Sequence, residues 1–144
     1  MDSTHRIIIA LVVVAAAAFV VVSGWVNPAK LNASTANVRH LLPSQFETEV
    51  IRSPQPVAVD FYATWCAPCR ELAPQFDEVA GGYAGRIKFV KVNVDEAQEL
   101  ADRYQIQALP MVVLFKGGQP VAHLLGLTLE AELKPKLDAL AAAK

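Results

Sequence analysis

An almost continuously apolar run, PVAVDFYA at residues 56–63, limits most strongly what this chain can fold into. A run of this composition is typical of a strand in a sheet that is covered on both of its faces. A helical pattern follows from about Pro68, with apolar side chains spaced by three and four residues. A chain that alternates between strands and helices is expected to fold as an α/β protein, with helices flanking a central mixed β-sheet.

The rest of the folded region continues this alternation. Further strands are predicted at 38–42, 86–95, 110–115 and 121–125. Further helices are predicted from Ser44, from Ala97 and from Thr128. Ser44 and Glu47 have the spacing of a capping box at the start of the first of these helices. Pro135 lies inside the last one and should kink it.

The last two predicted strands have the pattern of a hairpin, with Gly117 and Gly118 in its turn. Pro120 has no N–H group to donate to a second neighbouring strand. The final strand is therefore expected at an edge of the sheet.

A second apolar stretch precedes the folded region, and its residues 7–22 carry no polar side chain. Up to Val26 it is about 20 residues long, enough for a helix to cross a hydrocarbon core of about 30 Å. A buried core helix is a poor interpretation, because a domain of this size has no core that could surround it. A retained membrane anchor and a cleaved signal peptide are the two remaining interpretations.

The flanks of this stretch bear on that choice. Arg6 and the small residues at 22–24 and 34–36 suit a signal peptide, whereas the length of the stretch and Trp25 at its far end favour an anchor. We predict a transmembrane anchor, a linker and a folded domain, at 1–26, 27–36 and 37–144. In either interpretation the segment directs export, so the domain is expected outside the cytoplasm, in the bacterial periplasm. Cleavage would give a soluble exported form instead.

Cys66 and Cys69 are the only cysteines, and their spacing allows a disulfide staple, a metal site or a reactive dithiol. A staple that closes so short a loop would remove little chain entropy. A metal site needs about four ligands, and the other soft candidates, His40 and His123, fall in predicted strands. The position between a strand and a helix favours a redox dithiol, with no metal and no cofactor.

The position also separates the roles of the two thiols. Cys66 is predicted at an exposed tip, where backbone N–H groups and the helix dipole lower the pKa of its thiol. Cys69 lies one turn further along, on the inward face, so the two sulfurs can bond. The pattern indicates a nucleophile and a resolving thiol.

Asp60 is the second unusual residue, because it lies in a strand that should be buried on both sides. Burial raises the pKa of a carboxyl group and tunes it for proton exchange near neutral pH. An aspartate hydrogen-bonded at a strand end is the alternative. Lys91, in a neighbouring predicted strand, is either the partner of Asp60 or an ordinary solvated lysine.

Charge excludes one class of partner. The formal net charge of −1 leaves no basic surface of the kind that binds nucleic acid.

Four segments resemble the thioredoxin family in their order and spacing: PVAVDFYATWCAPCRELAPQFDEVA, IKFVKVNVDE, YQIQALPMVVLFKGGQ and LLGL. The resemblance spans about residues 37–143 and implies a thioredoxin fold with reversible dithiol–disulfide exchange. It makes Cys66 the attacking thiolate, Cys69 the resolving cysteine and Asp60 the acid that relays protons to Cys69. Pro110 would be a cis-proline facing the sulfurs, and Lys91 a supporting residue. The implied substrate groove is lined by Trp65, Ala67, Pro68, Leu109, Pro110, Leu125, Gly126 and Leu127.

Three positions depart from the family pattern. Ala67 stands where glycine is usual, Arg70 where lysine is usual and Met111 where threonine is typical. Residues in and around the dithiol help to set its reduction potential, so these positions leave the direction of electron flow open.

The sequence therefore predicts an exported, membrane-anchored protein-disulfide reductase. Its partners would be protein disulfides and a transmembrane thiol electron donor. Two alternatives remain, a thiol oxidase or isomerase of exported proteins and a non-catalytic binding module with the same fold.

Overall fold

The computed structural model describes residues 37–126 and 129–142, except for the side chains of residues 129 and 130. The predicted anchor at 1–26, the linker at 27–36, Leu127 and Thr128 lie outside these residues. Within the described part of the chain, no helix is both long and apolar enough to cross a membrane.

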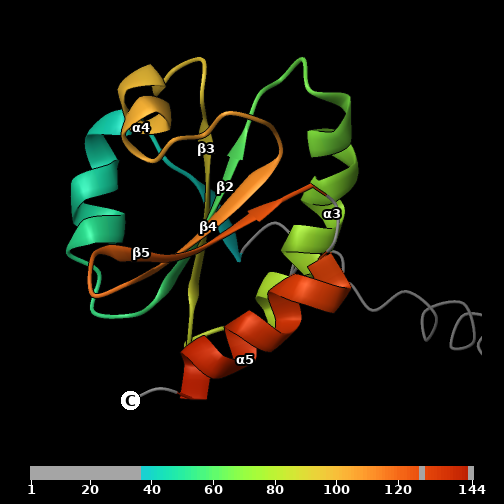
Figure 1. Ribbon diagram of the computed structural model, residues 1–144. Coiled ribbons are helices and arrows are strands. Elements are labelled where there is room, and N and C mark those ends of the chain that lie inside the picture. The colour runs from blue at the N-terminus through green and yellow to red at the C-terminus, as the bar shows by residue number, and fades with distance from the viewer. Residues whose placement is uncertain (1–36, 127–128, 143–144) are drawn as a thin grey trace, which may run out of the picture. The chain divides into compact units, whose positions relative to one another are not determined.

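A five-stranded mixed sheet forms the centre of the domain, in the order β1-β3-β2-β4-β5 (Figure 1). The strands are β1 (Val38–His40), β2 (Val57–Tyr62), β3 (Lys88–Asn93), β4 (Met111–Lys116) and β5 (Gln119–Leu125). β1 and β2 run parallel to β3, whereas β4 runs antiparallel to both β2 and β5. The predicted mixed sheet is confirmed, as is the position of the last strand at an edge.

Helical segments cover both faces of the sheet. They are η1 (Pro43–Gln45), η2 (Glu47–Ile51), α3 (Ala67–Gly82), α4 (Gln98–Arg103), η3 (Leu129–Leu133) and α5 (Lys134–Ala142). α3 and α5 pack on one face, and α4 with the η1–η2 segment packs on the other (Figure 1). Ala58 belongs to the first core, and Val59 and Phe61 belong to the second. Residues 57–61 of β2 are accordingly all buried, as its composition predicts.

The first helical segment begins earlier than predicted. Leu42 is the N-cap of η1, and its backbone N–H donates to Oε1 of Gln45 at 3.0 Å. Pro43 occupies the first helical position, where its fixed φ and missing N–H are well tolerated. The predicted capping box of Ser44 and Glu47 is wrong for this reason, and two short segments stand in place of one helix.

The last predicted helix changes its type along its length. The π-helix η3 ends at Leu133 and α5 begins at Lys134 without a break, so Pro135 lies inside one continuous helical run. The change of helix type lies directly before this proline, which cannot donate the backbone hydrogen bond of an interior helical residue. The kink at Pro135 stays a prediction.

The hairpin turn is as predicted, since Gly117 and Gly118 both have positive φ, 57° and 77°. A Cβ atom on Gly118 would lie 2.6 Å from the carbonyl oxygen of Ile51. Gly118 is therefore required both for its backbone conformation and for the close approach of the turn to η2.

Candidate active site

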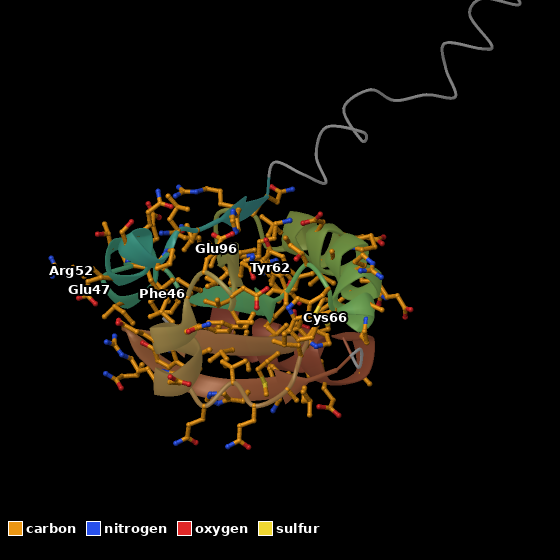
Figure 2. All side chains as sticks on the ribbon, turned by 90° about the horizontal axis from the view of Figure 1, so that it is seen from above. Phe46, Glu47, Arg52, Tyr62, Cys66 and Glu96 are labelled. Carbon is orange, nitrogen blue, oxygen red and sulfur yellow. A yellow bond between two sulfur atoms is a disulfide. The ribbon has the colours of Figure 1, made fainter. Side chains whose placement is uncertain are left out.

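Cys66 lies where β2 leads into α3 (Figure 2), and Cys69 lies in the first turn of α3. Cys66 is the N-cap of α3, and its Sγ accepts a hydrogen bond from the backbone N–H of Cys69 at 3.2 Å. The two residues form a disulfide across a Cα–Cα distance of 5.3 Å. The helix geometry thus brings the sulfurs together and directs a backbone donor at Cys66.

Cys66 is less exposed than the sequence predicts. Its exposed fraction is 6%, whereas that of the preceding Trp65 is 68%. The disulfide draws the Cys66 side chain into a small cluster with Ala63 and Cys69. The exposed side chain at this tip is therefore Trp65, and Cys66 is buried.

A groove of about 580 Å³ runs past Cys66. The residues predicted to line a substrate groove include Trp65, Ala67, Pro68 and Leu109, and all four line this one. Its other wall comes from the end of β3, α4 and the loop that follows, with side chains including Val94, Asp95, Asp102 and Ile106. A polypeptide lying in the groove would contact Cys66 from this side.

Other predicted groove residues are placed differently. The Leu109–Pro110 bond is cis, as expected, and the N–H of Gly126 donates to the carbonyl of Pro110 at 3.0 Å. Leu125 is exposed at the end of β5, opposite Met111 in the register. Pro110, Leu125 and Gly126 are not among the described residues that line the groove at Cys66.

A second hollow, of about 280 Å³, lies behind the disulfide. It is lined by Asp60, Tyr62, Ala63, Thr64, Cys69, Arg70, Ala73 and Lys91. Asp60 is only 2% exposed, and its Oδ1 has no hydrogen-bond partner among the described residues. The interpretation of Asp60 as a hydrogen-bonded strand-end aspartate therefore does not apply to this oxygen.

The environment of Asp60 favours its neutral form. Burial is the main cause that raises the pKa of its carboxyl group to about 7. The charge of Lys91 lowers this pKa by a smaller amount, and the charge of Asp77 raises it by a smaller amount. Asp60 and Lys91 are register partners on the parallel strands β2 and β3, so their side chains leave the same face of the sheet. Lys91 is half-buried at this hollow, which is not the setting of an ordinary solvated lysine.

Sequence reasoning did not find two carboxylates at the site. Asp95 accepts a hydrogen bond from Nε1 of Trp65 at 3.0 Å, which holds the exposed indole beside the groove. Asp77 is half-buried on α3, and burial raises the pKa of its carboxyl group while Lys91 lowers it. Asp95 could have been found from the sequence, because it closely follows the end of β3. The carboxyl ends of the parallel strands β2 and β3 meet at one edge of the sheet.

Comparison with known proteins identifies this arrangement. The sequence model of the family described as Thioredoxin matches residues 37–139. The chain belongs to the thioredoxin family. It is 46% identical over 95 residues to Thioredoxin 1 of Nostoc sp., which covers 66% of this chain and 89% of that protein. It is 41% identical over 102 residues to Thioredoxin of Allochromatium vinosum, which covers 71% and 95%. A third relative, Thioredoxin of Pseudomonas aeruginosa, is 37% identical over 103 residues, covering 72% and 95%.

Family membership and the paired cysteines together define the activity. Thioredoxin-family proteins act on protein disulfides, and this chain has the Cys66–Cys69 pair that such exchange requires. The protein is a protein-disulfide oxidoreductase of the thioredoxin family, with this dithiol as its redox centre.

Proposed function

We propose that the protein is an exported, membrane-anchored thioredoxin that reduces disulfides in other exported proteins. One observation carries the chemical part of this proposal. The Cys66–Cys69 disulfide lies between an outer groove, which receives the substrate, and an inner hollow that contains Asp60. The two sides of the dithiol are thus suited to two different tasks, binding a polypeptide and moving a proton.

The reaction begins with the reduced enzyme. The Cys66 thiolate, at the N-terminus of α3, attacks one sulfur of the substrate disulfide and forms a mixed disulfide. The other substrate sulfur leaves as a thiolate and takes a proton from water. Backbone N–H groups at the start of α3 stabilise the negative charge on Cys66 before the attack.

The second step uses the inner hollow. Asp60 in its ionised form takes the proton of Cys69, and the resulting thiolate attacks Sγ of Cys66 and releases the second substrate thiolate, which takes a proton from water. The substrate gains two electrons and ends as two thiols, while Cys66 and Cys69 lose them and end as a disulfide. A carboxyl group with a pKa of about 7 is suited to this transfer, because it can accept and release a proton near neutral pH.

The cellular part of the proposal rests on the sequence before the folded domain. The apolar stretch from residue 7 to residue 26 would hold the domain at the outer face of a bacterial inner membrane, in the periplasm. The domain then has no direct access to the cytoplasmic thiol pool, so two electrons per cycle must cross the membrane, and a transmembrane thiol electron carrier could supply them. Substrates of the right class include apocytochrome c, misfolded exported proteins and peroxidases.

Insulin reduction tests the chemical part. The full-length chain should accelerate the reduction of insulin by dithiothreitol, and Cys66→Ser should abolish that acceleration. Arg52→Gln is a suitable control, because Arg52 is exposed and lies far from Cys66 (Figure 2). A wild-type rate no higher than that of buffer, or full activity in Cys66→Ser, would contradict the proposal.

The direction of electron flow needs a separate measurement, the reduction potential of the dithiol against glutathione. A value near about −270 mV supports a reductase, and a value near about −120 mV indicates a thiol oxidase instead. Unchanged partner binding after loss of both cysteines, without exchange activity, would indicate a binding module. Membrane attachment is tested by fractionation, since deletion of residues 1–26 should move the protein out of the membrane fraction.

A further inference from the structure

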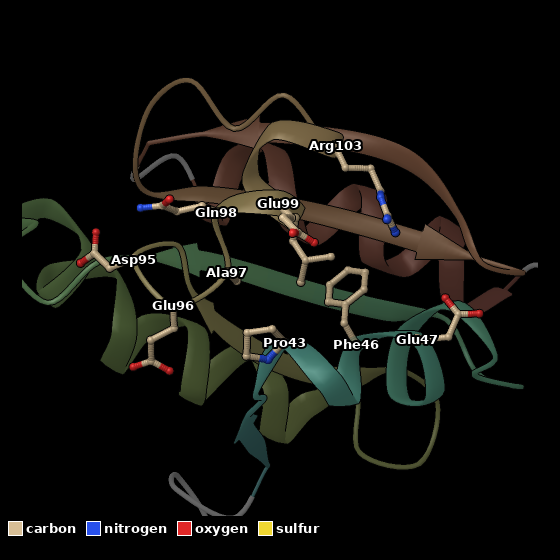
Figure 3. Close-up of a pocket in the computed structure, with 10 residues that line it drawn as sticks. Pro43, Phe46, Glu47, Asp95, Glu96, Ala97, Gln98, Glu99 and Arg103 are labelled. Carbon is tan, nitrogen blue, oxygen red and sulfur yellow. The ribbon is translucent and has the colours of Figure 1, made fainter.

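A further hollow, of about 470 Å³, adjoins the groove at Cys66 (Figure 3). The two share Asp95 and Gln98 as lining residues, at the point where β3 leads into α4. The further hollow continues between α4 and the segment that carries Pro43 and Phe46. A polypeptide bound at Cys66 can therefore extend along the start of α4 without leaving a concave surface.

Carboxylates dominate the charge of this continuous surface. We define the acidic surface as Asp95, Glu96, Glu99 and Asp102, all of which are exposed. None of the four forms an ion pair with another described residue. Arg103 is the one basic side chain that the described residues contribute to the two hollows, and Glu47 at the far end is paired with Arg52. Figure 3 shows three of these side chains, Asp95, Glu96 and Glu99, among the residues that line the further hollow.

Hydrogen bonds to the acidic surface do not cancel its charge. Asp95 accepts from the indole of Trp65, and Glu96 accepts from the side-chain amide of Asn93 at 3.2 Å. Both donors are neutral side chains, so these hydrogen bonds add no positive charge to the acidic surface. The hydrogen bond from Trp65 also ties the acidic surface to the exposed ring next to the reactive sulfur.

The groove points to a polypeptide occupant independently of these charges. Trp65 is a large side chain that is 68% exposed and lines the groove beside Cys66, and tryptophan is enriched at surfaces that bind other proteins. A chain that contacts Trp65 while its disulfide meets Cys66 lies close to Asp95, which is hydrogen-bonded to Trp65, and to Asp102, which lines the same groove.

We propose that the acidic surface selects substrate disulfides that are flanked by lysine or arginine residues, bound as an extended chain from Cys66 along α4. The inference rests on the proposed reductase function and adds the class of substrate. Exposed charges act over about 10 Å at an ionic strength of 0.1 M, which covers several residues of an extended chain. Such complementary charges raise association rates and disfavour partners of the same sign.

Matched peptides test the proposal. Three synthetic peptides carry the same disulfide-closed loop, flanked on both sides by lysine, glutamate or serine. The full-length chain, in a non-ionic detergent, is reduced, freed of reductant and mixed with each peptide in a stopped-flow instrument. Each second-order rate constant is divided by that of the same peptide with β-mercaptoethanol, a neutral thiol, to remove the intrinsic effect of the flanks. We expect a lysine-to-glutamate ratio of about tenfold at low salt, falling below about twofold at high salt.

Two double variants assign the preference to the surface. Glu96→Gln with Glu99→Gln should lower the lysine-to-glutamate ratio by about threefold or more. Glu78→Gln with Glu132→Gln removes the same charge from α3 and η3 and should leave the ratio unchanged.

The outcomes separate this inference from the reductase function. Equal normalised rates for all three peptides would overturn the inference and leave the reductase function standing. A lysine preference that survives in Glu96→Gln with Glu99→Gln, or falls equally in the α3–η3 control, would also overturn it. Failure to reduce any peptide would remove the reductase function and the inference together.

Discussion

Asparagine at position 60 should make the oxidised protein more stable at neutral and alkaline pH. Asp60 is almost fully buried, and its folded-state pKa of about 7 lies above the ordinary value of 3.8. Between these two pH values the unfolded chain has lost the proton that the folded protein keeps. The stability of the wild type therefore falls as pH rises through this window, and stays constant with respect to this group above pH 7. Asp60→Asn removes the ionisation and should remove this loss.

The size of the effect follows from the difference between the two pKa values. At about 1.4 kcal/mol for each pKa unit, it corresponds to about 4 kcal/mol at pH 8. Asparagine keeps a buried polar group in an environment where Asp60 Oδ1 has no partner, so we expect a net gain of about 2 to 4 kcal/mol.

Urea unfolding of the oxidised full-length chain between pH 4 and pH 9 measures this effect. At pH 4 the free energy of unfolding of Asp60→Asn should equal that of the wild type or lie up to about 2 kcal/mol below it. Between pH 4 and about pH 7 it should gain about 4 kcal/mol relative to the wild type, and above pH 7 the two curves should run parallel. Asp102→Asn, at an exposed position, is the control and should follow the wild type at every pH. A constant difference from pH 4 to pH 9, or a less stable Asp60→Asn at pH 8, would refute the reasoning.

Further predictions concern the dithiol, the hairpin turn and the core. Cys69→Ser should accumulate a mixed disulfide between Cys66 and a substrate on non-reducing gels, and Cys66→Ser should form none; trapping by both variants alike would contradict the assigned roles. Gly117→Ala should cost about 1 kcal/mol for its positive φ alone, whereas Gly118→Ala should cost clearly more, because its Cβ meets a carbonyl oxygen at 2.6 Å. Equal losses in urea unfolding would show that the close approach is not limiting. Phe76→Ala, at a 1% exposed position, should lower the free energy of unfolding by about 3 to 5 kcal/mol, and a loss below about 1 kcal/mol would contradict the packing described.

The central strand and the dithiol helix could be predicted because their signals are local. The continuous apolar run of β2 indicates burial on both faces wherever its neighbours come from. Pro68 near the start of α3 and the spacing of the two cysteines place the sulfurs at the beginning of a helix. The raised pKa of Asp60 follows from the same run, because desolvation depends on burial rather than on a particular partner.

Other features depend on distant parts of the chain and could not be read locally. The contact between Trp65 and Asp95 requires β2 and β3 to be adjacent and parallel, which the sheet order decides. The low exposure of Cys66 follows from formation of the disulfide and from packing with Ala63. At the first helix, two local signals compete, and Pro43 starts the segment before Ser44 can cap it.

The two edges of the sheet bear on how the protein can handle unfolded substrates. Among the described residues, the sheet ends on one side at β1, which has three residues, and on the other at β5, which contains Pro120. Short strands and prolines are devices by which proteins keep sheet edges from pairing with foreign strands. A reductase of this class meets loosely folded chains, which are rich in segments able to pair in that way. Edges of this kind offer such chains little to pair with, which lowers the risk that a bound substrate adds a strand to the sheet and starts an aggregate.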